Sequence, residues 1–170
     1  GYAVLAPALF DRVEPGIELD YSDQGMQRGV EIARGKLDIT KTLQDLAAAV
    51  SELQQYGKVG AVGYCFGGLL TYLMSCHNPD LTCGVGYYGG GIAGVLAQKP
   101  QTPLMLHFGE LDAHIPMSDV EKIKQAIPEV PVYTYDADHG FNCDQRDSYN
   151  APAAEAALTK TLDFFAKQLA

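Results

Sequence analysis

A cysteine stands in this chain where a nucleophile for acyl transfer could be used. Residues 59–64 form an apolar run that predicts a short strand, a helix is expected from about Gly67, and Cys65 lies at the turn between them. Such a turn exposes its central side chain at the carboxyl end of a strand, beside a helix N-terminus that favours negative charge. We expect the flanking glycines, Gly63 and Gly67, to relieve backbone crowding. Because a thiolate is a strong nucleophile near neutral pH, the segment predicts acyl transfer through Cys65.

An acid and a base follow the next strands along the chain. Asp112 comes just after an apolar strand that ends at Phe108, and His139 comes after a strand over residues 132–135. The carboxyl ends of parallel strands meet at one edge of a sheet, and nucleophile, acid and histidine in this chain order form a hydrolase triad. His139 would accept the thiol proton and later return a proton to the leaving group. Asp112 would hold the imidazole in the required tautomer and stabilise its charged form.

Each of these residues also has a simpler interpretation. Cys65 could be a small buried residue packed among glycines, Asp112 a turn residue, and His139 a loop cap. Glu110 lies close enough to Asp112 to compete for the role of the acid. The other histidines fit helix termination at His77, a core position at His107, and either a site-lining or a solvated-loop position at His114.

The elements that must position these residues alternate between strands and helices. We expect strands over residues 2–7, 59–64, 81–88, 102–108 and 132–135. Helices are expected from an Asp38 cap to about Tyr56, after Gly67, from a capping box of Ser118 and Glu121, and over residues 151–169. This alternation predicts an α/β fold, with a mostly parallel sheet between helices on both faces as a three-layer sandwich.

Four ordered motifs carry a family resemblance along the whole chain. The segments GYCFGG at 63–68, GYYG at 86–89, GELD at 109–112 and DHGF at 138–141 closely resemble the dienelactone hydrolases, as do residues 1–10 and 162–165. The resemblance implies an α/β-hydrolase that cleaves lactones or small carboxylic esters through a thioester, without a cofactor or a metal. The best-known members of the family open dienelactone, a carboxymethylene butenolide.

The resemblance also implies a role for individual residues. By their matching positions, Cys65, Asp112 and His139 are the catalytic residues, and the backbone N–H of Phe66 is one half of the oxyanion hole. Substrate-binding roles are implied for three further residues, Arg12, Tyr88 and Phe141.

The chain departs from the family pattern in two ways. Four residues after the catalytic histidine, where the family carries a second carboxylate-binding arginine, stands Cys143, and Arg146 lies three residues further on. Related lactones and simple esters are therefore open as substrates. The family's first strands, its second oxyanion donor and a thiol-activating glutamate precede the position that Gly1 matches. We therefore expect one domain over residues 1–170 that is incomplete at its N-terminus and is completed by a further segment or by a second copy in a homodimer.

Composition narrows the possible partners and compartments. A net charge of −9 argues against nucleic acid and anionic membranes. The four cysteines show neither a C-x-x-C pair nor zinc-ligand spacing. We expect Cys76 and Cys83 to be core residues. A reactive thiol suits a reducing cytoplasm, and no secretory signal or membrane-spanning run is visible.

Two other classes of function remain open from the sequence. A glutamine amidotransferase-like enzyme would also use a cysteine at such a turn. It requires a glutamate two residues after the histidine, and this chain has Phe141 two residues after His139. A non-catalytic binding or interaction protein on the same scaffold is the alternative to a lactone or ester hydrolase.

Overall fold

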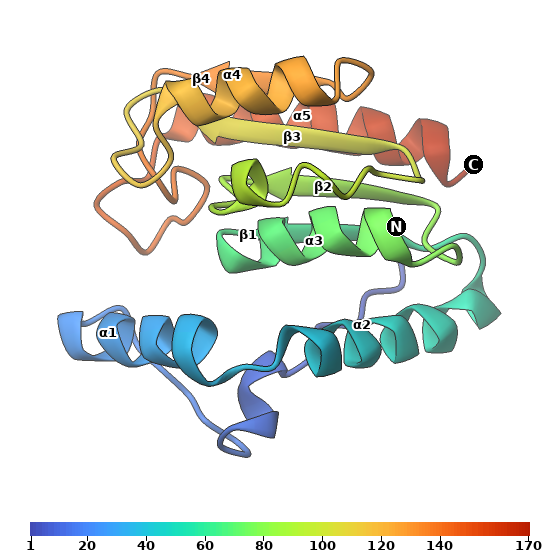
Figure 1. Cartoon of the computed structure of the whole chain (residues 1–170), viewed down its shortest axis with the longest axis horizontal. Coiled ribbons are helices and arrows are strands. Elements are labelled where there is room, and N and C mark those ends of the chain that lie inside the picture. Colours follow the sequence, from blue (N-terminus) through green and yellow to red (C-terminus); the bar gives the residue numbers. More distant parts are fainter. The chain divides into compact units, whose positions relative to one another are not determined.

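The chain consists of two compact units. The computed structural model describes all residues from Gly1 to Ala170, and they group into residues 1–56 and residues 57–170 (Figure 1). The second unit contains the whole sheet together with Cys65, Asp112 and His139. The single domain expected over the whole chain stays a prediction.

The second unit is built on a parallel sheet of four strands. The strands lie in the order β1 (Gly60–Tyr64), β2 (Cys83–Tyr87), β3 (Leu104–Gly109) and β4 (Val132–Tyr135), and every neighbouring pair is parallel. Helices α3 (Phe66–His77) and α4 (Met117–Ala126) cover one face, and α5 (Ala151–Gln168) covers the other (Figure 1). The predicted α/β fold with helices on both faces of a parallel sheet is confirmed.

Glycines allow α3 to approach the sheet closely. A Cβ at Gly86 would lie 3.2 Å from the carbonyl oxygen of Gly68, and a Cβ at Gly68 would lie 2.7 Å from the carbonyl oxygen of Tyr87 and 3.0 Å from the Cα of Gly89. Side chains at these positions would force the first turn of α3 away from β2. The close packing holds the start of α3, and the residue just before it, at the carboxyl ends of β1 and β2.

A buried polar network lies between the sheet and α5. His107 on β3 is fully buried, and its Nδ1 lies 2.9 Å from Tyr135 Oη on β4. Its Nε2 lies 3.2 Å from Thr161 Oγ1 on α5, which in turn lies 2.7 Å from Tyr87 Oη. The prediction that His107 is a core histidine with satisfied hydrogen bonds is confirmed.

The first unit is helical and lacks the predicted strand over residues 2–7. No strand is formed there, although the run is apolar. An extended segment becomes a strand only when another backbone supplies its ladder of hydrogen bonds, and no strand lies within this unit. The unit instead contains a 3-10 turn (Leu9–Arg12), α1 (Asp23–Glu31), a π-helical turn (Ile32–Lys36), α2 (Ile39–Leu53) and a second 3-10 turn (Gln54–Tyr56).

The helix ends test the local predictions. Asp38 caps α2 by accepting a hydrogen bond from the backbone N–H of Lys41 at 3.2 Å, as expected. The capping box predicted for α4 is wrong, because the helix begins at Met117, with Pro116 at its N-cap position and no side-chain cap. Ser118 is therefore already inside the helix. None of the helices combines the length and the apolar character needed to cross a membrane.

Candidate active site

Cys65 occupies a strained turn between β1 and α3. Its backbone has φ 54° and ψ −115°, a conformation that costs a non-glycine residue on the order of 1–3 kcal/mol. A Cβ at Gly63 would lie 2.0 Å from the carbonyl oxygen of Gly67, so glycine is required at position 63. A Cβ at Gly67 would meet nothing within 4 Å, so the crowding expected at both flanking glycines exists only at the first. The thiol is exposed, whereas Cys76 and Cys83 are buried, as predicted.

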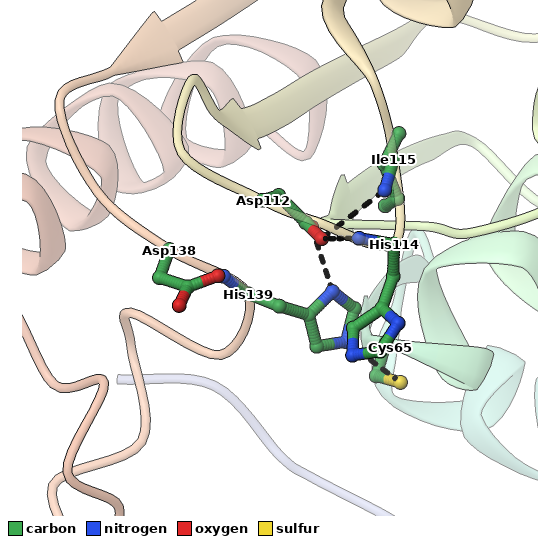
Figure 2. Close-up of polar contacts among 6 residues, drawn as sticks. All are labelled: Cys65, Asp112, His114, Ile115, Asp138 and His139. Carbon is green, nitrogen blue, oxygen red and sulfur yellow. Dashed lines mark hydrogen bonds and ion pairs between the residues drawn. The ribbon is translucent and has the colours of Figure 1, made fainter.

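The structure brings the predicted acid and base to this cysteine. Asp112 follows β3 and His139 follows β4, so both lie at the same edge of the sheet as Cys65. His139 Nδ1 lies 2.7 Å from Asp112 Oδ2, and His139 Nε2 lies 3.1 Å from Cys65 Sγ (Figure 2). A carboxylate only accepts hydrogen bonds, so Nδ1 carries a proton and Nε2 is the nitrogen that shares a proton with the sulfur of Cys65.

Asp112 is held by its own loop. Its side chain is fully buried, and Oδ1 accepts hydrogen bonds from the backbone N–H groups of His114 at 2.8 Å and Ile115 at 3.1 Å (Figure 2). Burial raises the pKa of Asp112, but the hydrogen bond from His139 and these two backbone donors outweigh it, so the pKa is lowered. Glu110, the alternative acid, instead accepts a hydrogen bond from Thr134 Oγ1 at 2.7 Å.

The electrostatics favour a charged thiolate–imidazolium pair. Partial burial raises the pKa of Cys65, but the hydrogen bond to His139 and its positive charge outweigh it, so the pKa of the thiol is lowered. Burial lowers the pKa of His139, but the hydrogen bonds to Asp112 and Cys65 raise it to about 9. Near neutral pH the pair can therefore hold the nucleophile as a thiolate before any substrate binds.

Phe66, whose backbone N–H is the expected oxyanion donor, follows Cys65 directly. It is the first residue of α3, so its backbone N–H has no carbonyl partner within the helix. Its hydrogen bond to the sulfur of Cys65 helps to lower the pKa of the thiol. This N–H therefore contacts the sulfur of Cys65, and its role as an oxyanion donor stays a prediction.

Aromatic side chains support the histidine. Tyr88, another residue with positive φ (37°), is buried, and its ring centroid lies 5.1 Å from that of His139. Phe141 is fully buried and packs edge-on against Tyr88 with 5.2 Å between the ring centroids. Phe141 thus supports Tyr88 from the core side, and the direct substrate contact expected of both residues stays a prediction.

The arginines occupy different settings. Arg12 forms a bidentate ion pair with Asp45 inside the first unit, so its positive charge is already matched. The guanidinium of Arg146 lies beside Gly140, 2.9 Å from the place of a Cβ there, and its charge helps to lower the pKa of Cys65. The half-buried Arg146 forms no ion pair, which leaves a free positive charge next to the site. Contact of Arg12 with a substrate remains a prediction.

His114 lies next to the site, a position that the sequence did not distinguish from a solvated loop. The ring of His114 packs edge-on against that of His139, with 5.5 Å between centroids and 87° between planes. Only its position two residues after Asp112 pointed to the site, and that spacing fits a solvated loop equally well. No cluster of three or more His, Cys, Asp or Glu side chains is arranged to hold a metal ion.

A parallel sheet with a nucleophile turn and an acid and a histidine after later strands defines an α/β-hydrolase. The family model of the dienelactone hydrolases matches residues 1–169. A relative from Synechocystis sp. is 36% identical over 189 residues, covering 99% of this chain and 76% of the relative. A carboxymethylenebutenolidase from Pseudomonas putida is 34% identical over 176 residues, covering 98% of this chain and 74% of its own.

A solved structure agrees with these sequence comparisons. A Klebsiella pneumoniae protein described as a dienelactone hydrolase superposes with a TM-score of 0.78 at 25% identity, covering 93% of this chain and 72% of the other. The chain belongs to the dienelactone hydrolase family, and it is a carboxylic ester hydrolase.

Proposed function

We propose that this protein hydrolyses a small lactone or carboxylic ester through Cys65, with His139 as the general base and Asp112 as its orienting acid. The observation that carries the proposal is the unbroken chain of hydrogen bonds from Asp112 through His139 to an exposed thiol on a strained turn. The lowered pKa of Cys65 and the raised pKa of His139 support it, because both favour a thiolate at neutral pH.

In the first half of the reaction, Cys65 Sγ attacks the acyl carbon and the carbonyl oxygen becomes an oxyanion. The backbone N–H of Phe66 donates a hydrogen bond to this oxygen. As the oxyanion collapses, the ester C–O bond breaks and His139 Nε2 gives its proton to the leaving oxygen. The product of this step is a thioester on Cys65; in a lactone, the leaving hydroxyl stays attached to the acyl group.

In the second half, His139 takes a proton from a water molecule, and the resulting hydroxide attacks the thioester carbon. The C–S bond breaks, and the carboxylic acid leaves with the thiolate restored. Asp112 remains ionised throughout and stabilises the imidazolium each time it forms.

The substrate class we propose is a lactone or ester whose acyl part carries a carboxylate. The relatives named carboxymethylenebutenolidases suggest such a compound. In a chain with a net charge of −9, an anionic substrate needs local positive charge, and the unpaired guanidinium of Arg146 beside Gly140 can supply it. Cys143 occupies the position at which the family carries its own arginine, so the carboxylate would be held from a different part of the same loop.

A reducing compartment such as the cytoplasm suits this chemistry. The four cysteines are free in the structure, and an exposed thiol with a lowered pKa would be oxidised in a secretory setting.

The test is hydrolysis of dienelactone isomers and of simple aryl esters by the wild type, Cys65→Ala and Cys76→Ala. Cys76 is a buried thiol far along α3, so its variant controls for the loss of a cysteine as such. We expect Cys65→Ala to lose at least about 10³-fold in turnover and Cys76→Ala to keep it. Equal activity of Cys65→Ala and the wild type would refute the mechanism, and turnover of simple esters alone would refute the carboxylate-bearing substrate.

A further inference from the structure

A second imidazole lies against the proposed base, and the mechanism above does not use it. The ring of His114 stands nearly perpendicular to that of His139 with centroids 5.5 Å apart, and the backbone N–H of His114 donates to Asp112 Oδ1 at 2.8 Å (Figure 2). One residue therefore contacts both the acid and the base. Its backbone fixes the carboxylate, and its ring touches the imidazole.

The two rings that flank His139 differ in their surroundings. Tyr88 is only 3% exposed and lies on the core side of the imidazole, 5.1 Å away between centroids. His114 is an exposed residue, and its ring stands against the imidazole with 5.5 Å between the centroids. With these neighbours in place, the side chain of His139 is 11% exposed even though it stands on a loop at the mouth of the site.

We propose that His114 is a positioning residue of this active site, whose ring covers the imidazole of His139 on the solvent side and keeps the thiolate–imidazolium pair sheltered from water. The inference rests on the proposed function, because it assigns a role toward the Cys65–His139 pair. It does not require His114 to touch the substrate or to exchange a proton.

The physical reason is the dielectric of the site. The attraction between the Cys65 thiolate and the His139 imidazolium weakens as water approaches, because the interaction energy falls with the effective dielectric constant. Removal of the ring would admit water beside His139 and would also remove one of the two ring contacts of its imidazole. The other groups against His139 are Cys65, Asp112 and Tyr88, and Arg146 lies beside the adjoining Gly140.

The shape of the ring should therefore matter more than its ability to titrate. His114→Phe keeps a flat ring that packs edge-on, whereas His114→Ala opens the site to water and leaves the backbone N–H to Asp112 in place. His77→Ala is the matched control, since His77 is an exposed histidine at the end of α3 that pairs with Gln98.

The experiment measures alkylation of Cys65 by iodoacetamide from pH 5 to pH 9 in the four proteins, resolved from the other thiols by peptide mass spectrometry. We expect His114→Ala to react about three- to tenfold more slowly near pH 6, because its thiol pKa moves back toward the ordinary value. His114→Phe and His77→Ala should stay within about twofold of the wild type. With an aryl ester, His114→Ala should lower kcat and leave KM unchanged.

Three results would overturn the inference. Unchanged alkylation in His114→Ala would show that the ring shelters nothing. An equal loss in His114→Phe and His114→Ala would assign the effect to the imidazole itself rather than to cover. A wild-type Cys65 no more reactive than the other thiols at mildly acidic pH would refute both this inference and the proposed function, whereas the first two results leave the proposed function intact.

Discussion

Two histidines on neighbouring parts of the same sheet have opposite acid–base properties. His107, in the network beneath α5, is surrounded by the hydroxyls of Tyr135 and Thr161. Burial, with a smaller effect of the nearby Lys160, lowers its pKa to about 3. His139, at the carboxyl edge of the sheet, loses solvent as well, yet its partners raise its pKa to about 9.

The difference lies in the charge of the partners. A hydroxyl can both donate and accept, so it serves a neutral imidazole without favouring the charged form. A carboxylate and a thiolate only accept and carry negative charge, so they stabilise the imidazolium. Burial alone therefore makes a histidine structural, and burial beside Asp112 and Cys65 makes it suitable as a base.

The largest expected effect comes from making the partner of His139 neutral, as the partners of His107 are. Asp112→Asn should lower kcat by about 10²–10⁴-fold, because an amide can stabilise the wrong tautomer and does not stabilise the imidazolium. The pKa of His139 should fall, and the thiol pKa of Cys65 should rise. The pH dependence of kcat and of Cys65 alkylation measures both. Glu110→Gln, on the same loop, is the matched control and should keep the wild-type rate; a similar loss in that variant would move the acid role to Glu110.

A second substitution tests Arg146, the arginine without an ion pair beside the Cys65–His139 site. Arg146→Gln should raise KM for a carboxylate-bearing lactone by about 10–100-fold, the loss of one charge-assisted contact, and should leave KM for a neutral aryl ester unchanged. Arg34→Gln in the first unit provides the control for loss of an arginine. An equal rise in KM for both substrates would assign Arg146 to the structure of its loop and not to recognition of the carboxylate.

The site around His139 and the network around His107 also differ in how far the sequence predicts them. The order of Cys65, Asp112 and His139 after successive strands was sufficient to predict their meeting, because parallel strands end at one edge. The core position of His107 followed from the apolar residues around it. The edge-on contact of His114 depends on the path of a loop, which no periodicity encodes.

The failures of local prediction have equally specific causes. The run at residues 2–7 has the composition of a strand, but a strand needs a partner backbone, and a sequence pattern does not tell whether one is present. Helix α1 was missed because Asp23–Glu31 is polar on average, contains two glycines and buries no side chain. The capping box of α4 was wrong because Pro116, two residues before Ser118, is already the N-cap of the helix.

The buried hydrogen-bond network around His107 should make the free energy of unfolding depend on pH. In the folded protein His107 stays neutral down to about pH 3, while in the unfolded chain its pKa returns to about 6.5, so the unfolded state binds the additional proton between these values. The stability that neutral His107 contributes is fully present above pH 6.5 and falls as the pH decreases toward 3. Between pH 6.5 and pH 5 the expected loss is about 2 kcal/mol. Urea unfolding at each pH measures it, and His107→Gln should remove this part of the slope; an unchanged slope in that variant would place the acid sensitivity elsewhere.

The smallest effect is expected from deleting one hydroxyl of the network. Tyr135→Phe keeps the ring that packs against Phe141 at 5.2 Å but leaves His107 Nδ1 without its partner. The expected cost is about 1–2 kcal/mol of unfolding free energy in urea, with kcat unchanged. Tyr56→Phe, at a tyrosine that is 70% exposed, should cost nothing measurable. The activity measurement is the sharper one, because Phe141 also supports Tyr88 and thereby His139. A loss of kcat in Tyr135→Phe would mean that the hydrogen-bond network of His107 helps to set the position of His139. The two histidines would then belong to a single coupled site.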